Sequence, residues 1–82
     1  MTDTEYMHMA LLEAQKAENE GEIPIGAVLV YRDSILALGH NRRETDHDPT
    51  AHAELLVLRR GAFRLNRWRL TELQAYLLNQ SD

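Results

Sequence analysis

The segment His52-Ala53-Glu54 contains the pair of side chains in this sequence with the most distinctive chemistry. A neutral imidazole can bind a zinc ion, and a carboxylate near the metal can carry protons without binding the metal itself. Side chains two residues apart on a helix point about 200° apart, so the pair would not normally face one ligand. At the first turn this restriction is relaxed, because a ligand can lie beyond the helix end, where free backbone N–H groups also point.

Taken by itself, this His-x-Glu pattern is a weak signal. A histidine and a glutamate at a helix start more often form an exposed first turn, with the acid near the positive end of the helix dipole. The neighbouring elements and motifs therefore have to decide between a structural and a catalytic interpretation.

Three elements are predicted before this segment. Small and apolar residues recur at helical spacing over residues 4–20, and Gly21 follows where a C-terminal glycine belongs, which predicts an amphipathic helix. Residues 25–31 are short, rich in β-branched side chains and apolar, as expected of a strand buried on both faces. After a turn at residues 32–34, residues 35–39 predict a second strand, and the hairpin supplies the central strands of a sheet.

A second helix is predicted to begin at Pro49, because Asp48 suits the N-cap position and proline suits the first helical position. It should end near Gly61. His52 and Glu54 then lie in its first turns. The apolar stripe predicted to pack on the sheet consists of Ala51, Leu55, Leu58 and Ala62.

The C-terminal part is ambiguous. Thr71 and Gln74 have the spacing of a helix capping box, whereas residues 73–78 could equally form a final strand. The order helix, strand, strand, helix and one uncertain element predicts an α/β fold in α-β-α layers, with too few elements to close its own core.

Composition narrows the classes of protein. The chain has 82 residues, enough for one small domain, and no cysteine, which excludes a disulfide-stapled secreted miniprotein and any thiolate ligand. Its start is acidic and polar, unlike a signal peptide, and its longest apolar run is far too short to cross a bilayer. We therefore expect a cytoplasmic protein without a membrane partner.

Charge is distributed unevenly along the chain. The net charge of −4 argues against simple electrostatic binding of nucleic acid, but arginines are concentrated in the second half. A phosphate backbone could use such a patch, although a solvated helix face is the commoner explanation. The arginines concerned are Arg59, Arg60, Arg64, Arg67 and Arg69, with Arg42 and Arg43 upstream.

Four segments together change the weight of the His-x-Glu pattern. They are Glu22-Ile23-Pro24-Ile25-Gly26-Ala27-Val28-Leu29-Val30, Gly39-His40-Asn41-Arg42, Asp48-Pro49-Thr50-Ala51-His52-Ala53-Glu54 and Asn66-Arg67-Trp68-Arg69-Leu70. In order and spacing they resemble the tRNA-specific adenosine deaminases of the cytidine and deoxycytidylate deaminase superfamily, and the resemblance covers residues 7–70. It implies a cytidine-deaminase-like fold. Deaminases of guanine and of cytosine nucleotides share His-Ala-Glu, but the first and last segments look more like the tRNA enzymes.

By this resemblance, His52 matches the histidine zinc ligand, Glu54 the proton-shuttling glutamate and Asn41 an asparagine that holds the target nucleoside. The family hydrolyses the 6-amino group of the wobble adenosine in tRNA to give inosine. A flipped-out base is attacked by zinc-bound hydroxide, and Glu54 would carry the proton toward the leaving ammonia. From the residues alone, a polar turn residue is the better explanation of Asn41.

The sequence departs from the family's pattern near its C-terminal end. In the family a strand and then P-C-x-x-C follow, and these cysteines complete the zinc site, but the 82 residues contain no cysteine. One imidazole holds zinc too weakly, and His40 and His47 are the nearby histidines that could substitute. We therefore expect residues 1–82 to form a single, truncated deaminase-like domain that is inactive alone.

Several interpretations stay open at this point. The chain could be half of a tRNA adenosine deaminase that forms a homodimer or needs a complementing C-terminal half. It could instead be a non-catalytic module that binds tRNA or a deaminase, a degenerate remnant, or a fragment of a guanine or cytosine-nucleotide deaminase.

Overall fold

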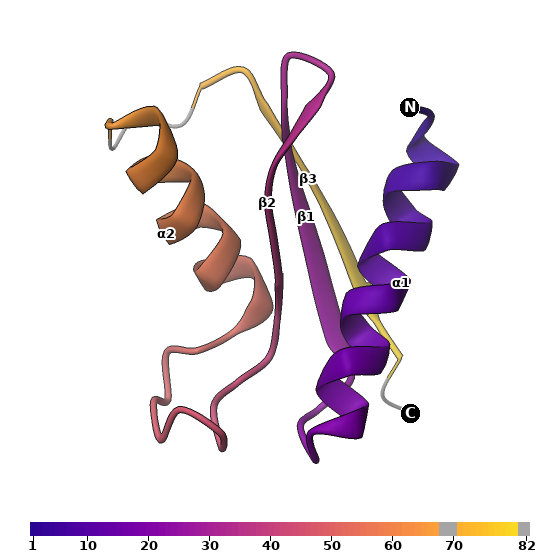
Figure 1. The fold of residues 1–82 in the computed structure, drawn as a ribbon, viewed down its shortest axis with the longest axis vertical. Coiled ribbons are helices and arrows are strands. Elements are labelled where there is room, and N and C mark those ends of the chain that lie inside the picture. The colour runs from indigo at the N-terminus through magenta and orange to yellow at the C-terminus, as the bar shows by residue number, and fades with distance from the viewer. Residues whose placement is uncertain (68–70, 81–82) are drawn as a thin grey trace.

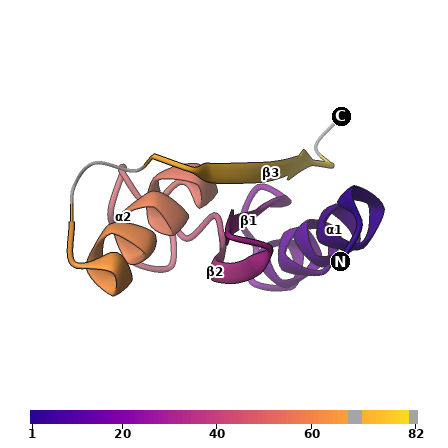
Figure 2. The ribbon, with the colours of Figure 1, turned by 90° about the horizontal axis from the view of Figure 1, so that it is seen from above.

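The computed structural model describes residues 1–67 and 71–80, which form two helices flanking a three-stranded sheet. The strand order is β2-β1-β3, with both pairings antiparallel. The helices cover opposite faces of the sheet (Figure 1), and the view from above shows three layers with the strands in the middle (Figure 2). The elements are α1 (Asp3–Asn19), β1 (Ile25–Tyr31), β2 (Ser34–His40), α2 (Ala53–Leu65) and β3 (Leu73–Asn79).

The first half of the chain contains the predicted elements. Helix α1 starts with a capping box between Thr2 and Glu5 and is followed by Gly21, whose φ of 78° suits glycine. Strand β1 is buried because it is central in the sheet, with a helix on each side. Strand β2 was expected to be central too, but it lies at an edge. The ambiguous C-terminal segment forms a strand, β3, which pairs with the other side of β1.

Alternate side chains of β1 divide the core into two clusters. Ala27 and Leu29 pack toward α2, whereas Val28 and Val30 pack toward α1. The register of β2 against β1 shifts between Leu29 and Val30, which leaves one extra residue, Leu36, on β2. Each helix therefore covers its own apolar layer.

The second helix differs from the prediction at both ends. It begins at Ala53 and not at Pro49, because Asp48 Oδ1 accepts hydrogen bonds from the backbone N and the hydroxyl of Thr50, at 2.8 and 2.7 Å. Those bonds make a local turn instead of a helix cap. The helix continues through Gly61 and ends at Leu65.

The face of α2 that meets the sheet was also predicted wrongly. Leu55 and Leu58, placed on the packing stripe with Ala51 and Ala62, are 39% and 37% exposed. The helix is closest to the sheet at Gly61, where an added Cβ would lie 2.5 Å from Leu29 Cδ2. The buried face of α2 is therefore the one that contains Gly61. Its buried residues are Ala53, Leu56, Val57 and Gly61.

Two sequence predictions concern residues outside the described part. The segment 68–70 of the family resemblance and Arg69 of the arginine patch both lie there. Among the residues that are described, no helix has the length and apolar character needed to span a membrane.

Candidate functional site

Asn41 connects the end of β2 to the start of α2. Its side chain is 2% exposed, and its Oδ1 accepts a hydrogen bond from the backbone N–H of Ala53 at 2.8 Å. Because a backbone N–H can only donate, this bond identifies the amide oxygen. Ala53 separates His52 from Glu54, so one buried hydrogen bond brings all three predicted site residues to the start of α2.

The backbone at His52 is extended, with φ −80° and ψ 147°, and this residue is the N-cap of α2. The angle of about 200° expected within a helix therefore does not apply to His52 and Glu54. The flanking Ala51 and Ala53 are buried, at 1% and 0% exposure, whereas His52 is half-buried and Glu54 is exposed. The alanines hold the backbone against the core and leave the imidazole and the carboxylate outside it.

The oxygen and the N–H groups of the Asn41 amide can have different roles. Its oxygen accepts the N–H of Ala53 and so caps α2. Within residues 1–67 and 71–80, its N–H groups have no protein partner. The turn-residue explanation was therefore incomplete, since the side chain organises the helix start and still has donors for a ligand.

Glu22 is a residue of this region that sequence reasoning missed. It is 7% exposed, and its carboxylate accepts bonds from the backbone N–H of Glu44 (3.2 Å) and from the N–H and hydroxyl of Thr45 (2.6 and 2.7 Å). Burial alone would raise the pKa of Glu22, but these hydrogen bonds, with the nearby Arg42 charge, hold that pKa below its ordinary value. Its partners lie 22 and 23 residues away, so no local pattern could have identified this role.

The loop organised by Glu22 is closed by further bonds. The backbone N–H of Arg42 donates to Ala51 O at 2.9 Å, and the Arg42 guanidinium donates to both carboxylate oxygens of Asp46. The loop from Asn41 to His52 is therefore held at both ends before any ligand binds.

The residues present do not by themselves fit a zinc ion. Within the described residues, no three His, Asp or Glu side chains come close enough together to hold a metal. His40 is not a replacement ligand, because its Nδ1 lies 3.0 Å from Glu13 Oε1 and its Nε2 lies 2.8 Å from Glu20 Oε1. His47 is exposed in the loop and belongs to no such group. A zinc ion bound by His52 would therefore need further ligands from outside these residues.

Comparison with known proteins identifies the family. The model of the cytidine and deoxycytidylate deaminase zinc-binding region matches residues 1–79. This chain belongs to that family. The α-β-α arrangement expected from the sequence is the fold of the deaminases to which it is similar.

Curated relatives of this deaminase-family chain include several tRNA-specific adenosine deaminases. The one from Bacillus subtilis is 49% identical over 78 residues, and the match covers 94% of this chain and 48% of that protein. One from Buchnera aphidicola is 42% identical over 76 residues, covering 93% and 47%. The chain thus spans about half the length of the curated relatives it matches.

Solved structures agree with this assignment of the deaminase fold. A structure from work on A-to-I editing by tRNA:A34 deaminases superposes with a TM-score of 0.88 at 40% identity, over 90% of this chain and 54% of that one. A guanine deaminase of Bacillus subtilis gives 0.87 at 34% identity, over 94% and 50%. The fold alone therefore does not separate the two substrates.

Proposed function

We propose that this chain supplies one half of a tRNA adenosine deaminase active site, which hydrolyses the wobble adenosine of tRNA to inosine. The observation that carries the proposal is the buried bond from Ala53 N–H to Asn41 Oδ1. It brings Asn41 next to His52 and Glu54 at one helix end, which supports the roles proposed for them as amide donor, metal ligand and proton carrier. Identities of 49% and 42% to tRNA-specific adenosine deaminases support the choice of substrate.

Each residue has a separate task in this proposal. His52 provides one zinc ligand, and two further ligands come from a polypeptide outside residues 1–82. Glu54 is exposed beside that ligand, where it can hold a proton and release it to a leaving group. Asn41 donates its free N–H groups to an acceptor on the bound nucleoside, while its oxygen keeps α2 in place.

The first test concerns zinc. We expect the purified 82-residue chain to retain less than stoichiometric zinc after dialysis, since His52 is one ligand where three are needed. Metal analysis measures this. One zinc per chain, lost in His52→Ala, would show that the 82 residues form a complete site of their own.

The second test concerns activity. The chain alone should form no inosine in an anticodon stem-loop, and adding a polypeptide with the P-C-x-x-C half should restore both zinc binding and inosine formation. Glu54→Gln should then abolish inosine while zinc stays bound, because Glu54 carries protons and does not bind the metal. His52→Ala should abolish both. Inosine from the unassisted, zinc-free chain would contradict the proposal.

Guanine deamination is the second candidate, because the guanine deaminase superposes almost as well as the tRNA:A34 deaminase. The complemented pair should release ammonia from the stem-loop and not from free guanine. The reverse result would assign the chain to the guanine enzymes. If neither substrate reacts, a non-catalytic binding module becomes the better explanation.

A further inference from the structure

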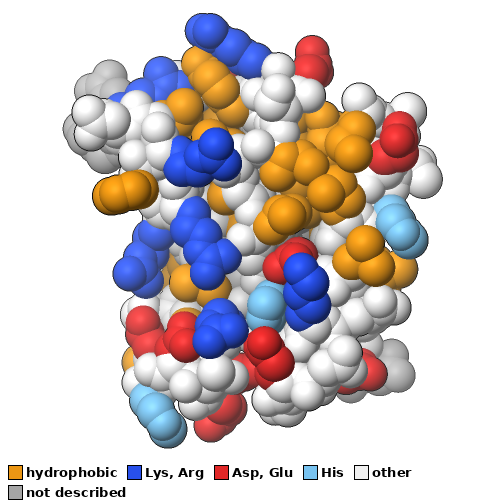
Figure 3. All heavy atoms as spheres, in the orientation of Figure 1, with side chains coloured by type: hydrophobic (Ala, Val, Ile, Leu, Met, Phe, Trp, Pro, Cys, Tyr) orange, Lys and Arg blue, Asp and Glu red, His pale blue; other side chains and the backbone are white. Residues whose placement is uncertain are grey.

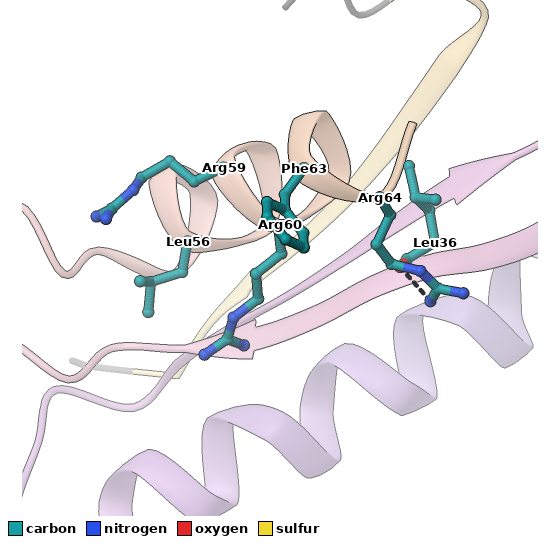
Figure 4. A pocket seen from close by; sticks show the side chains of 6 residues that line it. All are labelled: Leu36, Leu56, Arg59, Arg60, Phe63 and Arg64. Carbon is teal, nitrogen blue, oxygen red and sulfur yellow. Dashed lines mark hydrogen bonds between the residues drawn. The ribbon is translucent and has the colours of Figure 1, made fainter. Parts of the chain in front are cut away.

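An open groove of about 730 Å³ runs between α2 and β2, on the side of α2 away from β3. Figure 4 shows that its lining combines apolar side chains with three arginines from one helix. It lies beside the middle and C-terminal turns of α2, whereas the candidate site lies at the N-terminal end of the same helix. The lining residues are Leu36, Leu56, Arg59, Arg60, Phe63 and Arg64.

Two of these guanidinium groups are held in place by the sheet. Arg60 Nη1 donates to Leu38 O at 2.6 Å, and Arg64 Nη1 donates to Leu36 O at 2.9 Å. Both carbonyls belong to β2, the edge strand, so these bonds also cover part of its free edge. A guanidinium has five N–H donors, so each arginine keeps most of its donors for a ligand. The order already imposed on the side chains lowers the entropy lost when a ligand binds.

In the part of the chain that the structure describes, the arginines of this groove lack close ion-pair partners, although local hydrogen bonds and, less strongly, the Arg59 charge lower the pKa of Asp48. Among the described residues, no carboxylate forms an ion pair with Arg59, Arg60 or Arg64. By contrast, Arg42 pairs with Asp46. Figure 3 shows blue side chains gathered along the α2 side of the face that displays the β2 edge. This local positive charge stands out on a chain whose net charge is −4.

The groove also presents an uncovered aromatic ring. Phe63 is 86% exposed, the most of any large hydrophobic side chain among the described residues. An exposed phenyl ring next to guanidinium groups offers a stacking surface beside donors for anions. Single-stranded nucleic acids are bound in this way, with bases stacked on aromatic rings and phosphates held by basic side chains.

We propose that the α2–β2 groove binds single-stranded RNA, with a base stacked on Phe63 and phosphates contacted by Arg59, Arg60 and Arg64. The exposed ring favours RNA over an acidic peptide, which could use the guanidinium groups but has no base to stack. The three arginines and one ring accommodate a short segment of a few nucleotides. RNA is also the substrate class of the proposed function, and the present proposal rests on that function to that extent. Binding in the groove needs neither zinc nor Glu54.

The test is binding of a fluorescein-labelled single-stranded RNA of about 12 nucleotides to the 82-residue chain, a length within the usual site sizes. Fluorescence anisotropy over a range of salt concentrations should give a slope of log K against log [salt] near −2, since about three phosphate contacts contribute roughly −0.7 each. Arg59→Gln should weaken binding and flatten that slope by about 0.7. Arg32→Gln, which removes a positive charge that is paired with Glu72 in the β1–β2 turn and does not line the groove, should leave both unchanged.

Phe63→Ala should weaken binding by about fivefold or more without changing the salt slope, because loss of stacking costs about 1–3 kcal/mol per base. Leu12→Ala, which shortens an exposed apolar side chain on α1, is the matched control and should have no effect. Circular dichroism of all four variants should be unchanged, since each side chain replaced is exposed.

Three results would overturn the proposal: no binding at low salt, equal losses in Arg59→Gln and Arg32→Gln, or competition by polyglutamate as strong as by unlabelled RNA. The last would assign the groove to acidic peptides. RNA binding should be the same with and without added zinc, because none of the candidate site residues lines the groove. A failed complementation assay with intact RNA binding would therefore count against the proposed function alone.

Discussion

Each helix packs closely on the sheet at a glycine, and the two contacts differ in which atoms lie next to that glycine. At Gly26 of β1, an added Cβ would overlap the carbonyl oxygen of Ala10 and lie 2.5 Å from the backbone N of Ala14, so the obstacle is the backbone of α1. At Gly61 of α2, the obstacles are the ends of the Leu29 and Leu36 side chains, at 2.5 and 3.1 Å. The α1 contact is backbone on backbone, whereas the α2 contact has side chains that can move.

This difference matches what each helix does. On α1, three of the five buried residues are alanines, which fit a close and rigid contact with β1. Helix α2 carries the candidate site at its first turn and the α2–β2 groove along its side. We infer that α1 and β1 form the scaffold, and that α2 is oriented by its side-chain packing and by the loop that precedes it.

The largest effect is expected from Gly26→Ala. Because the backbone of α1 must move away from the sheet, we expect a loss of about 3 kcal/mol or more in the free energy of unfolding. Gly61→Ala should cost less than about 1.5 kcal/mol, since leucine ends can shift and alanine favours a helix over glycine by about 1 kcal/mol. Urea unfolding followed by circular dichroism measures both. Equal losses would remove the distinction between the two faces.

The next effect concerns how α2 begins. Asn41→Ala removes the buried acceptor of the Ala53 N–H and should cost about 2 kcal/mol. Asn41→Asp keeps an oxygen there but loses the amide N–H donors, so it should keep more of the stability than Asn41→Ala does. In the complemented enzyme, Asn41→Asp should still lose activity. If it were fully active, the proposed nucleoside contact by the amide N–H groups would be wrong.

A pH titration compares two buried carboxylates. Burial by itself would raise the pKa of both Glu22 and Glu13. Hydrogen bonds nevertheless hold both pKa values below the usual value of 4.5, and the donors to Glu13 are His40 and Lys16. Because both pKa values are lowered in the folded state, their contribution to stability is present above pH 4.5 and is lost as the pH falls below it.

We expect Glu22→Gln and Glu13→Gln each to flatten the fall in unfolding free energy between about pH 5 and pH 3. The stability contributions of the two carboxylates should respond differently to added salt. The Glu22 carboxylate accepts from uncharged Thr45 and backbone groups, so its contribution should persist in 1 M salt, whereas that of Glu13 with Lys16 should weaken (screening length about 3 Å). The same salt response in both variants would contradict this assignment of causes.

The smallest effect is expected at the start of α1, which has an exposed cap. Thr2 accepts the Glu5 N–H at 3.2 Å, and Thr2→Ala should cost about 0.5–1 kcal/mol, less than Asn41→Ala at the buried cap of α2. Thermal unfolding of the two variants side by side measures the difference. A larger loss at Thr2 would mean that α1, and not α2, depends on its first turn.

The family residues and the first helix and hairpin could be read from the sequence because their signals are local. Helical spacing with Gly21 predicted α1 to within a residue at each end, and the apolar run of β1 predicted a strand buried on both faces. His52 and Glu54 were expected at a helix start, and they are there. Their roles in zinc binding and proton transfer stay predictions.

Other features depended on contacts between segments far apart in the chain. Asp48 and Pro49 had the right types for a helix start, but Asp48 bonds to Thr50, and the helix begins where Asn41 accepts the Ala53 N–H. Gly61 looked like a helix end, but it is a helix interior position that lets α2 approach β1.

The sequence by itself determined the local elements and the chemistry available at His52, Glu54 and Asn41, because periodicity and residue type act over a few neighbouring residues. Only the tertiary structure decided where α2 begins and which of its faces is buried. It also decided that Arg60 and Arg64 bond to the edge strand, 22 and 28 residues away respectively. A donor or a buried carboxylate such as Glu22 takes whichever partner the packed chain brings within hydrogen-bond distance. Spacing along the sequence does not contain that information.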